Sequence, residues 1–100
     1  MDAALADPAV RGIVITSAKA DFAGGMDLNI LARMKEAAGA DPARGLFEGI
    51  LAIHRLLRKI ERAGADPRTG KGGKPVAWAA PGLSAGIGTE IGLACHRRFL

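Results

Sequence analysis

The sequence predicts an α/β fold in which parallel strands are joined through helices. Two short apolar runs, residues 12–17 and 76–80, have the β-branched and aromatic composition of buried strands. Between them, apolar residues recur at spacings of three and four over residues 46–60, which is the pattern of an amphipathic helix. Because a helix separates the two runs, we expect parallel neighbouring strands with a right-handed crossover.

Start and stop signals place three helices. Asp27 can cap the first, which Gly39 ends. Asp41 followed by Pro42 combines a capping carboxylate with a proline at the first helical position, and it predicts the longest helix, which Gly64 ends. The expected bounds of the three helices are 28–38, 43–63 and 86–95, and a further strand is expected over residues 98–100.

Composition limits the classes of function. The 100 residues, of which 49% are hydrophobic, fit a single domain with a modest core. No apolar run approaches the ~18 residues of a transmembrane helix, and no secretory signal precedes the first strand, so no membrane span is expected. Cys95 is the only cysteine, which excludes an internal disulfide and fits a reducing, cytoplasmic location. His54 and His96 have no second ligand at metal-binding spacing, so no metal is expected, and His96 is interpreted as a cation at a helix C-terminus.

The formal charge of +4 is concentrated in residues 55–74, which carry seven cations against two carboxylates. Such a run is most often the solvated face of a helix and its following loop. A basic rim that attracts the phosphates of a nucleotide-bearing ligand is the functional alternative. No aromatic residue interleaves these charges as a stacking platform requires, so nucleic acid is not expected as a partner. The glycines between Gly64 and Lys71 do not form a phosphate-binding P-loop, because their spacing is wrong and no strand precedes them.

Two glycine-bearing segments follow the two apolar runs. Residues 21–28 read Asp-Phe-Ala-Gly-Gly-Met-Asp-Leu, and residues 81–90 read Pro-Gly-Leu-Ser-Ala-Gly-Ile-Gly-Thr-Glu. Glycines between a strand and a helix let backbone N–H groups face a ligand closely. Two such turns that converge can hold a developing oxyanion, which favours acyl-thioester chemistry.

Glu90 is the candidate for proton transfer beside the second turn. It lies four residues beyond Gly86 on a helix otherwise built of small and apolar residues, and we expect its carboxyl group to be partly buried there. A surface carboxylate favoured by the helix dipole is the alternative.

Ser84 lies in a sequence that matches the G-x-S-x-G elbow of serine hydrolases. A catalytic triad needs an acid and a histidine from later loops. The residues that follow Ser84 offer only Glu90 and His96, both placed on the helix directly after the serine. We therefore interpret Ser84 as a small turn residue.

The two glycine-bearing segments together resemble the signatures of the enoyl-CoA hydratase/isomerase (crotonase) superfamily. Residues 14–17 and 21–28 are similar to its strand and F-x-A-G-x-D-L turn, and residues 74–96 to its second signature, which begins K-P-V and ends E-L-A-L-A-C. The ending Ala-Cys-His-Arg-Arg is similar to the hydratase half of bacterial multifunctional fatty-acid oxidation proteins, whose other half is a 3-hydroxyacyl-CoA dehydrogenase. The resemblance spans nearly the whole chain, with both signatures in the right order.

This resemblance implies a β-β-α spiral fold and an acyl-CoA substrate whose thioester oxygen is held by two backbone N–H groups. These would be the amides of Met26 and Ile87, and Glu90 takes the place of the first catalytic glutamate. The other residues that it places along the substrate- and CoA-binding segments are Gly24, Gly25, Asp27, Leu28, Asn29 and Gly86. The implied reaction is hydration of the 2,3-double bond of an enoyl-CoA in fatty-acid β-oxidation. It needs no cofactor beyond the coenzyme A of the substrate, since NAD belongs to a dehydrogenase half that is not in these residues.

The sequence departs from the family pattern at two site positions and in its carboxylates. Ile87 replaces a central glycine, and Met26 replaces a usual small residue and narrows the acyl pocket. Hydratases also take a second glutamate from a following segment, which residues 1–100 do not include. We therefore expect the central part of a single crotonase-like domain, truncated at both ends, inactive alone and part of an oligomer or multienzyme complex when full length. An isomerase that uses only the first glutamate and a non-catalytic acyl-CoA-binding or assembly fragment are the alternatives.

Overall fold

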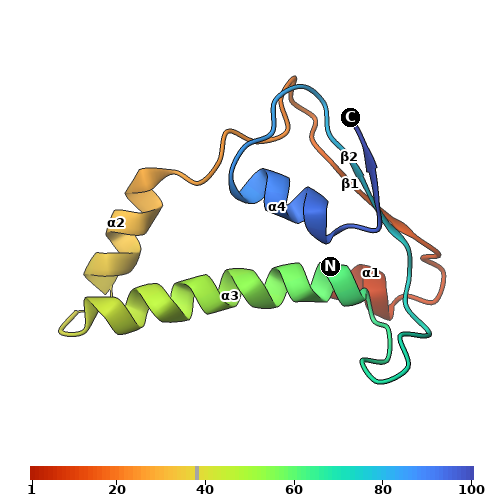
Figure 1. Ribbon diagram of the computed structural model, residues 1–100, viewed down its shortest axis with the longest axis horizontal. Helices are drawn as coiled ribbons and strands as arrows, with labels where there is room; N and C mark the ends of the chain where they lie inside the picture. The colour runs from red at the N-terminus through yellow and green to blue at the C-terminus, as the bar shows by residue number, and fades with distance from the viewer. Residues whose placement is uncertain (38) are drawn as a thin grey trace.

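The computed structural model describes residues 1–37 and 39–100 and has an α/β architecture. Three strands form one parallel sheet in the order β1-β2-β3, which confirms the predicted class and the parallel pairing of the first two strands. Figure 1 shows α4 between the sheet and α3, whereas α2 and the N-terminal half of α3 extend away from the sheet. The elements are α1 (Asp2–Ala6), β1 (Ile13–Thr16), α2 (Leu28–Ala37), α3 (Pro42–Arg62), β2 (Val76–Ala79), α4 (Ile87–Ala94) and β3 (Arg97–Phe99).

The observed bounds lie close to the expected ones. The predicted last residue of α2, Ala38, lies outside the described residues. The short helix α1 was not predicted. Its residue Leu5 packs against the core, and the Lys74 ammonium donates to the carbonyl oxygen of Ala4 at 2.8 Å. A contact across seventy residues of sequence therefore holds a segment that has no helical signal of its own.

More buried and more exposed residues alternate along β1 and β2, so one face of the sheet is covered and the other is open. Val76 and Trp78 of β2 are buried, and their register partners Ile13 and Ile15 of β1 are half-buried on the same face. Val14, on the opposite face, is 66% exposed. The buried core is small and consists of Ile60, Ala63, Val76, Trp78, Ala80 and Cys95.

The helix α4 packs closely on the covered face through two buried glycines. Gly88 and Gly92 lie four residues apart and so share one side of the helix. A Cβ atom added at Gly92 would overlap the ring of Trp78, and one added at Gly88 would overlap the Cβ of Ala23. The position of α4 on the sheet therefore depends on the absence of side chains at these two sites.

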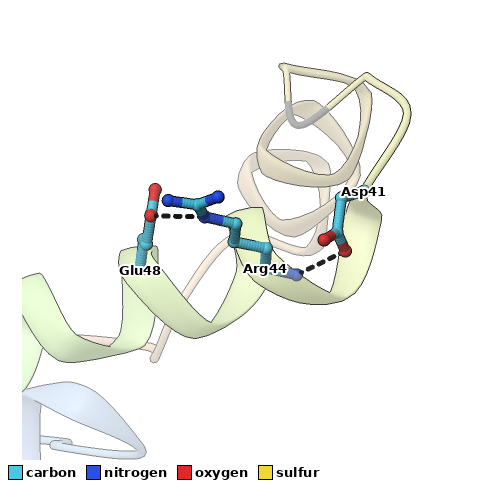
Figure 2. A network of polar contacts seen from close by, with 3 residues as sticks. All are labelled: Asp41, Arg44 and Glu48. Carbon is cyan, nitrogen blue, oxygen red and sulfur yellow. Dashed lines mark hydrogen bonds and ion pairs between the residues drawn. The ribbon is translucent and has the colours of Figure 1, made fainter.

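The long helix α3 begins as its sequence predicts. Asp41 is the N-cap, and its Oδ1 accepts a hydrogen bond from the Arg44 backbone N–H at 3.0 Å. Figure 2 shows the Arg44 side chain turning the other way, where its Nε donates to Glu48 Oε1 at 3.1 Å. Both side chains of this ion pair are well exposed, so it contributes only about 0.3–0.5 kcal/mol, and the cap is the main local signal.

The C-terminus of α3 differs slightly from the expected one. The left-handed residue that ends the helix is Ala63, with φ of 45°, and Gly64 continues with φ of 81°. The Ala63 side chain is fully buried, and its N–H donates to the carbonyl oxygen of Lys59 at 2.8 Å. Tertiary packing thus places a non-glycine residue where glycine is usual.

Only part of the apolar stripe of α3 is covered. Ile60 is buried and Leu57 is half-buried, because α4 packs over this end of the helix. Leu46 and Ile50 are 39% and 40% exposed at the other end, where only α2 packs. Within the described ranges, no helix is both long and apolar enough to cross a bilayer.

Candidate functional site

The two glycine-bearing turns meet beyond the carboxyl ends of β1 and β2. Ala23 and Ser84 form a parallel bridge that continues the pairing of these strands. The Phe22 N–H donates to the Leu83 carbonyl oxygen at 2.9 Å, and the Ala85 N–H donates to that of Ala23 at 2.9 Å. In Figure 1 the two connections run side by side from the sheet toward α2 and α4. The sheet register therefore fixes the register of the two turns.

Gly25 and Gly86 are the points of closest approach between the turns. A Cβ atom built on Gly86 would lie 3.2 Å from the Gly25 Cα and 4.0 Å from the Met26 backbone nitrogen. Gly86 has φ of 56° and ψ of −131°, a conformation that residues with a Cβ rarely adopt. The structure thus brings together the backbones of Gly25, Met26 and Gly86, three residues that the sequence assigned to the site.

The backbone N–H groups of Met26 and Ile87 make no hydrogen bond within residues 1–37 and 39–100. Ile87 is the first residue of α4, so its N–H is one of the donors that a helix leaves unsatisfied at its positive end. The next amides are engaged, since those of Thr89 and Glu90 donate to the Gly86 carbonyl oxygen at 3.0 and 3.2 Å. Met26 and Ile87 are both half-buried, so two donors remain available on adjoining turns.

Glu90 is exposed, and the expectation of a partly buried carboxyl group is wrong. The reason lies in the packing of α4: Gly88 and Gly92 face the sheet, and a residue midway between them lies about 200° around the helix from each. Glu90 instead lines an open hollow of about 310 Å³ between α3 and α4. The other residues around this hollow are His54, Leu57, Arg58, Glu61 and Ala94.

The remaining residues assigned to coenzyme A binding lie on the segment that leads into α2. Gly24, Asp27, Leu28 and Asn29 are all exposed, and the Asp27 carboxylate accepts a hydrogen bond from the Asn29 N–H at 2.8 Å. Leu28 is 78% exposed. These four residues form a solvent-facing lip next to the half-buried pair Gly25 and Met26.

An apolar groove between α2 and α3 was not singled out from the sequence. It has a volume of about 620 Å³, and Leu31, Leu46 and Ile50 supply much of its apolar wall. Part of the signal was the apolar periodicity over residues 46–60, which begins at Leu46 and predicts a packed face on the long helix. What the sequence did not show is that the two faces leave a groove.

His96 has a structural role that the sequence did not reveal. It lies beyond the end of α4, its Nδ1 accepts a hydrogen bond from the Val76 N–H at 3.0 Å, and its Nε2 lies 2.9 Å from the Glu61 carbonyl oxygen. Because Nδ1 accepts, the ring proton is on Nε2, which donates to Glu61. The interpretation of His96 as a cation at a helix end is therefore replaced by a neutral ring that joins β2 to α3.

Two further residues have local roles. The Ser84 hydroxyl lies 3.3 Å from the Thr89 hydroxyl. His96 is hydrogen-bonded to Val76 at the other end of β2, so Ser84 and His96 do not form the nucleophile and base of a hydrolase. Cys95 is buried, its thiol donates to the Ile91 carbonyl oxygen at 3.2 Å, and burial raises the pKa of the thiol. In the described part of the chain, no three His, Cys, Asp or Glu side chains gather into a group that could hold a metal.

No protein-family model matches the chain.

Proposed function

We propose that this chain binds an acyl-CoA thioester and belongs to an enoyl-CoA hydratase-type domain with the crotonase fold. The backbone N–H groups of Met26 and Ile87 would hold the thioester carbonyl oxygen. The observation that carries the proposal is the contact between Gly25 and Gly86, which brings two turns with unpaired amides together. Two donors held on adjoining turns would need little reorganisation when negative charge develops on the oxygen.

The chemistry follows from that placement. As a nucleophile adds to C3 of an enoyl thioester, electron density moves to the carbonyl oxygen, and the intermediate has enolate character. Hydrogen bonds from both amides and the positive end of α4 would stabilise that negative charge. Loss of one such donor typically raises the activation free energy by ~3 kcal/mol. Water is the nucleophile in hydration: its oxygen bonds to C3, one of its protons goes to a base, and C2 takes a proton from an acid.

Glu90 is the proposed proton-transfer residue. It lies one turn of α4 beyond Ile87, and its carboxylate is open to solvent and not held in an ion pair with any described residue. A single carboxylate can accept a proton from one carbon and return it to another, which is the requirement for moving a double bond. Because the resemblance assigns only Glu90 to proton transfer within residues 1–100, an enoyl-CoA isomerase is the second candidate.

Binding can be tested without turnover. Crotonyl-CoA labelled with ¹³C at the thioester carbonyl should show a lower carbonyl stretching frequency when bound than when free. A thioether analogue that lacks the carbonyl should bind about 10- to 100-fold more weakly, because two hydrogen bonds are lost. An unshifted carbonyl band together with equal affinity for the thioether would remove the assignment of Met26 and Ile87.

Turnover distinguishes the two reactions. Incorporation of ¹⁸O from labelled water indicates hydration, whereas migration of the double bond without ¹⁸O indicates isomerisation. In a complete version of the enzyme, Glu90→Gln should lower either rate by about 10²-fold or more with little change in KM, because an amide cannot accept the proton. Glu48→Gln is the matched control, since Glu48 pairs with Arg44 on the exposed surface of α3. If Glu48→Gln abolished the rate and Glu90→Gln did not, the alignment of the second signature would be wrong.

A further inference from the structure

A basic hollow lies at the opposite end of β2 from the Met26 and Ile87 amides. Its volume is about 480 Å³, and its walls are the last turns of α3, the loop over residues 65–75 and the ring of His96. Figure 1 shows this loop below the sheet, away from the two glycine-bearing turns. The hollow is therefore separate from the site proposed for the thioester.

Arg62 is the cation that this hollow leaves available. The walls hold three cations, and two of them are already engaged. Arg58 donates to Glu61 at 2.7 Å, and the Lys74 ammonium donates to the carbonyl oxygens of Ala4 and Asp7, the latter at 2.6 Å. The Arg62 side chain makes no hydrogen bond or ion pair within the described ranges, and it is exposed. Its planar guanidinium group can give two parallel hydrogen bonds to one oxyanion.

The carboxylates in the walls do not neutralise this arginine. Glu61 is already paired with Arg58. Asp66 accepts a hydrogen bond from the Arg68 backbone N–H at 2.8 Å, which closes a turn within the loop. Neither acid is paired with Arg62. Asp66 keeps its negative charge, so the three cations and two carboxylates of the walls leave a net charge of +1.

Backbone donors line the same hollow. Gly72 and Gly73 are among its wall residues, and neither N–H group is hydrogen-bonded among the residues that the structure describes. Gly72 has φ of 87°, a left-handed conformation that interrupts regular hydrogen bonding along the loop. Successive free amides beside a guanidinium group form the donor set that oxyanions require.

The surroundings add long-range attraction of the same sign. Arg68 and Lys71 extend from the loop, and Arg55 lies on a preceding turn of α3, whereas the neighbouring Lys59 is paired with Asp2 at 2.7 Å. A cluster of like charges around a concave surface raises the local concentration of anions.

We propose that this hollow binds a small phosphate-bearing ligand, with the Arg62 guanidinium group and the Gly72 and Gly73 amides on the phosphate oxygens. The concave shape and the limited volume favour a phosphomonoester or diphosphate group over a polymer. No Phe, Tyr or Trp side chain lines the hollow to stack a base, so single-stranded nucleic acid lacks its usual partner there. This site is independent of the thioester proposal and stands if that proposal fails.

Nuclear magnetic resonance titration of the whole chain tests the site with sodium phosphate and pyrophosphate against sodium chloride at equal ionic strength. We expect saturable shifts of the Gly72 and Gly73 amide signals, with pyrophosphate binding more tightly than phosphate. Arg62→Gln should weaken pyrophosphate binding about 10- to 100-fold, as the loss of charged hydrogen bonds predicts. Arg55→Gln removes the same charge from the same helix but lies outside the walls of the hollow, so it should change the affinity less than about twofold.

Three results would each overturn the proposal. Equal losses in Arg55→Gln and Arg62→Gln would show that only the overall charge matters. Shifts that grow linearly with phosphate and never saturate would show screening without a site. Binding of a single-stranded oligonucleotide with no response to pyrophosphate would assign the surface to a polymer. Arg62→Lys keeps the charge but loses the planar guanidinium group, so it should bind pyrophosphate with an intermediate affinity. An intermediate affinity would show that the loss in Arg62→Gln does not come from misfolding.

Discussion

Replacing Gly92 by alanine sets two physical effects of opposite sign against each other. Alanine is the better helix former and alone would stabilise α4 by ~1 kcal/mol. The added Cβ, however, would overlap three atoms of the Trp78 ring. Trp78 is only 4% exposed and its ring is rigid, so the helix rather than the ring must move.

The packing effect should be larger than the propensity effect. Adding a methyl group to a well-packed interior costs ~1–3 kcal/mol, and lifting α4 also exposes part of Trp78 to water. After subtraction of the gain in helix propensity, we expect a net loss of about 1–2 kcal/mol and a Tm lower by about 4–16 °C. Trp78 is the sole tryptophan of the chain, so urea unfolding followed by its fluorescence measures this contact directly.

Gly49→Ala on α3 is the matched control. The atom that its Cβ would overlap is the terminal methyl carbon of Met34, the far end of a flexible side chain that can rotate away. This variant should range from neutral to about 1 kcal/mol more stable, because the propensity effect is then unopposed. If Gly92→Ala were as stable as the parent chain, α4 would not sit on Trp78 as the structure describes.

Three further variants test the turns, the histidine and the thiol. Gly86→Ala should lower the free energy of unfolding in urea by about 1–3 kcal/mol, because Gly86 has a positive φ. Gly24→Ala is the control: no atom lies within 4 Å of its added Cβ, so the free energy of unfolding should change by less than about 0.5 kcal/mol. Equal effects of the two variants would contradict the close approach of the turns. His96→Leu leaves the Val76 N–H without an acceptor and should cost about 1–3 kcal/mol, so an unchanged urea midpoint would mean that this bond is not made. Burial raises the pKa of the Cys95 thiol, so the stability that the buried thiol contributes is complete below the ordinary thiol pKa of about 8.5 and falls as the pH rises above that value. The difference in unfolding free energy between the parent chain and Cys95→Ala should therefore shrink from pH 7 to pH 10. A difference that stays constant over this range would refute the reasoning.

The sheet and the long helices could be predicted because several signals agreed. Two β-branched runs separated by a helical stripe leave only a crossover connection, so parallel pairing followed from the order of elements. Asp41 and Pro42 mark the start of α3 locally. The helix α1 could not be found in this way, because it is held by the Lys74 side chain and by core contacts from distant parts of the chain.

The site was predictable to a smaller extent. The meeting of Gly25 with Gly86 follows from turns at the same edge of a parallel pair. The burial of Glu90 was misjudged because a pattern of large apolar residues does not count glycine as a packing residue. In α4 the buried face is defined by Gly88 and Gly92, and that choice turns Glu90 toward α3.

The same packing links the fold to the proposed chemistry and allows positioning to be separated from proton transfer. Lifting α4 by Gly92→Ala should move the Ile87 N–H away from the Met26 turn, and the shift of the bound thioester carbonyl band should then decrease. Glu90→Gln should leave that band in place, because the side chain faces α3 rather than the sheet, and should lower only the rate of proton transfer. If both variants removed the carbonyl shift equally, Glu90 would act on substrate position, and its assignment as the proton-transfer group would be wrong.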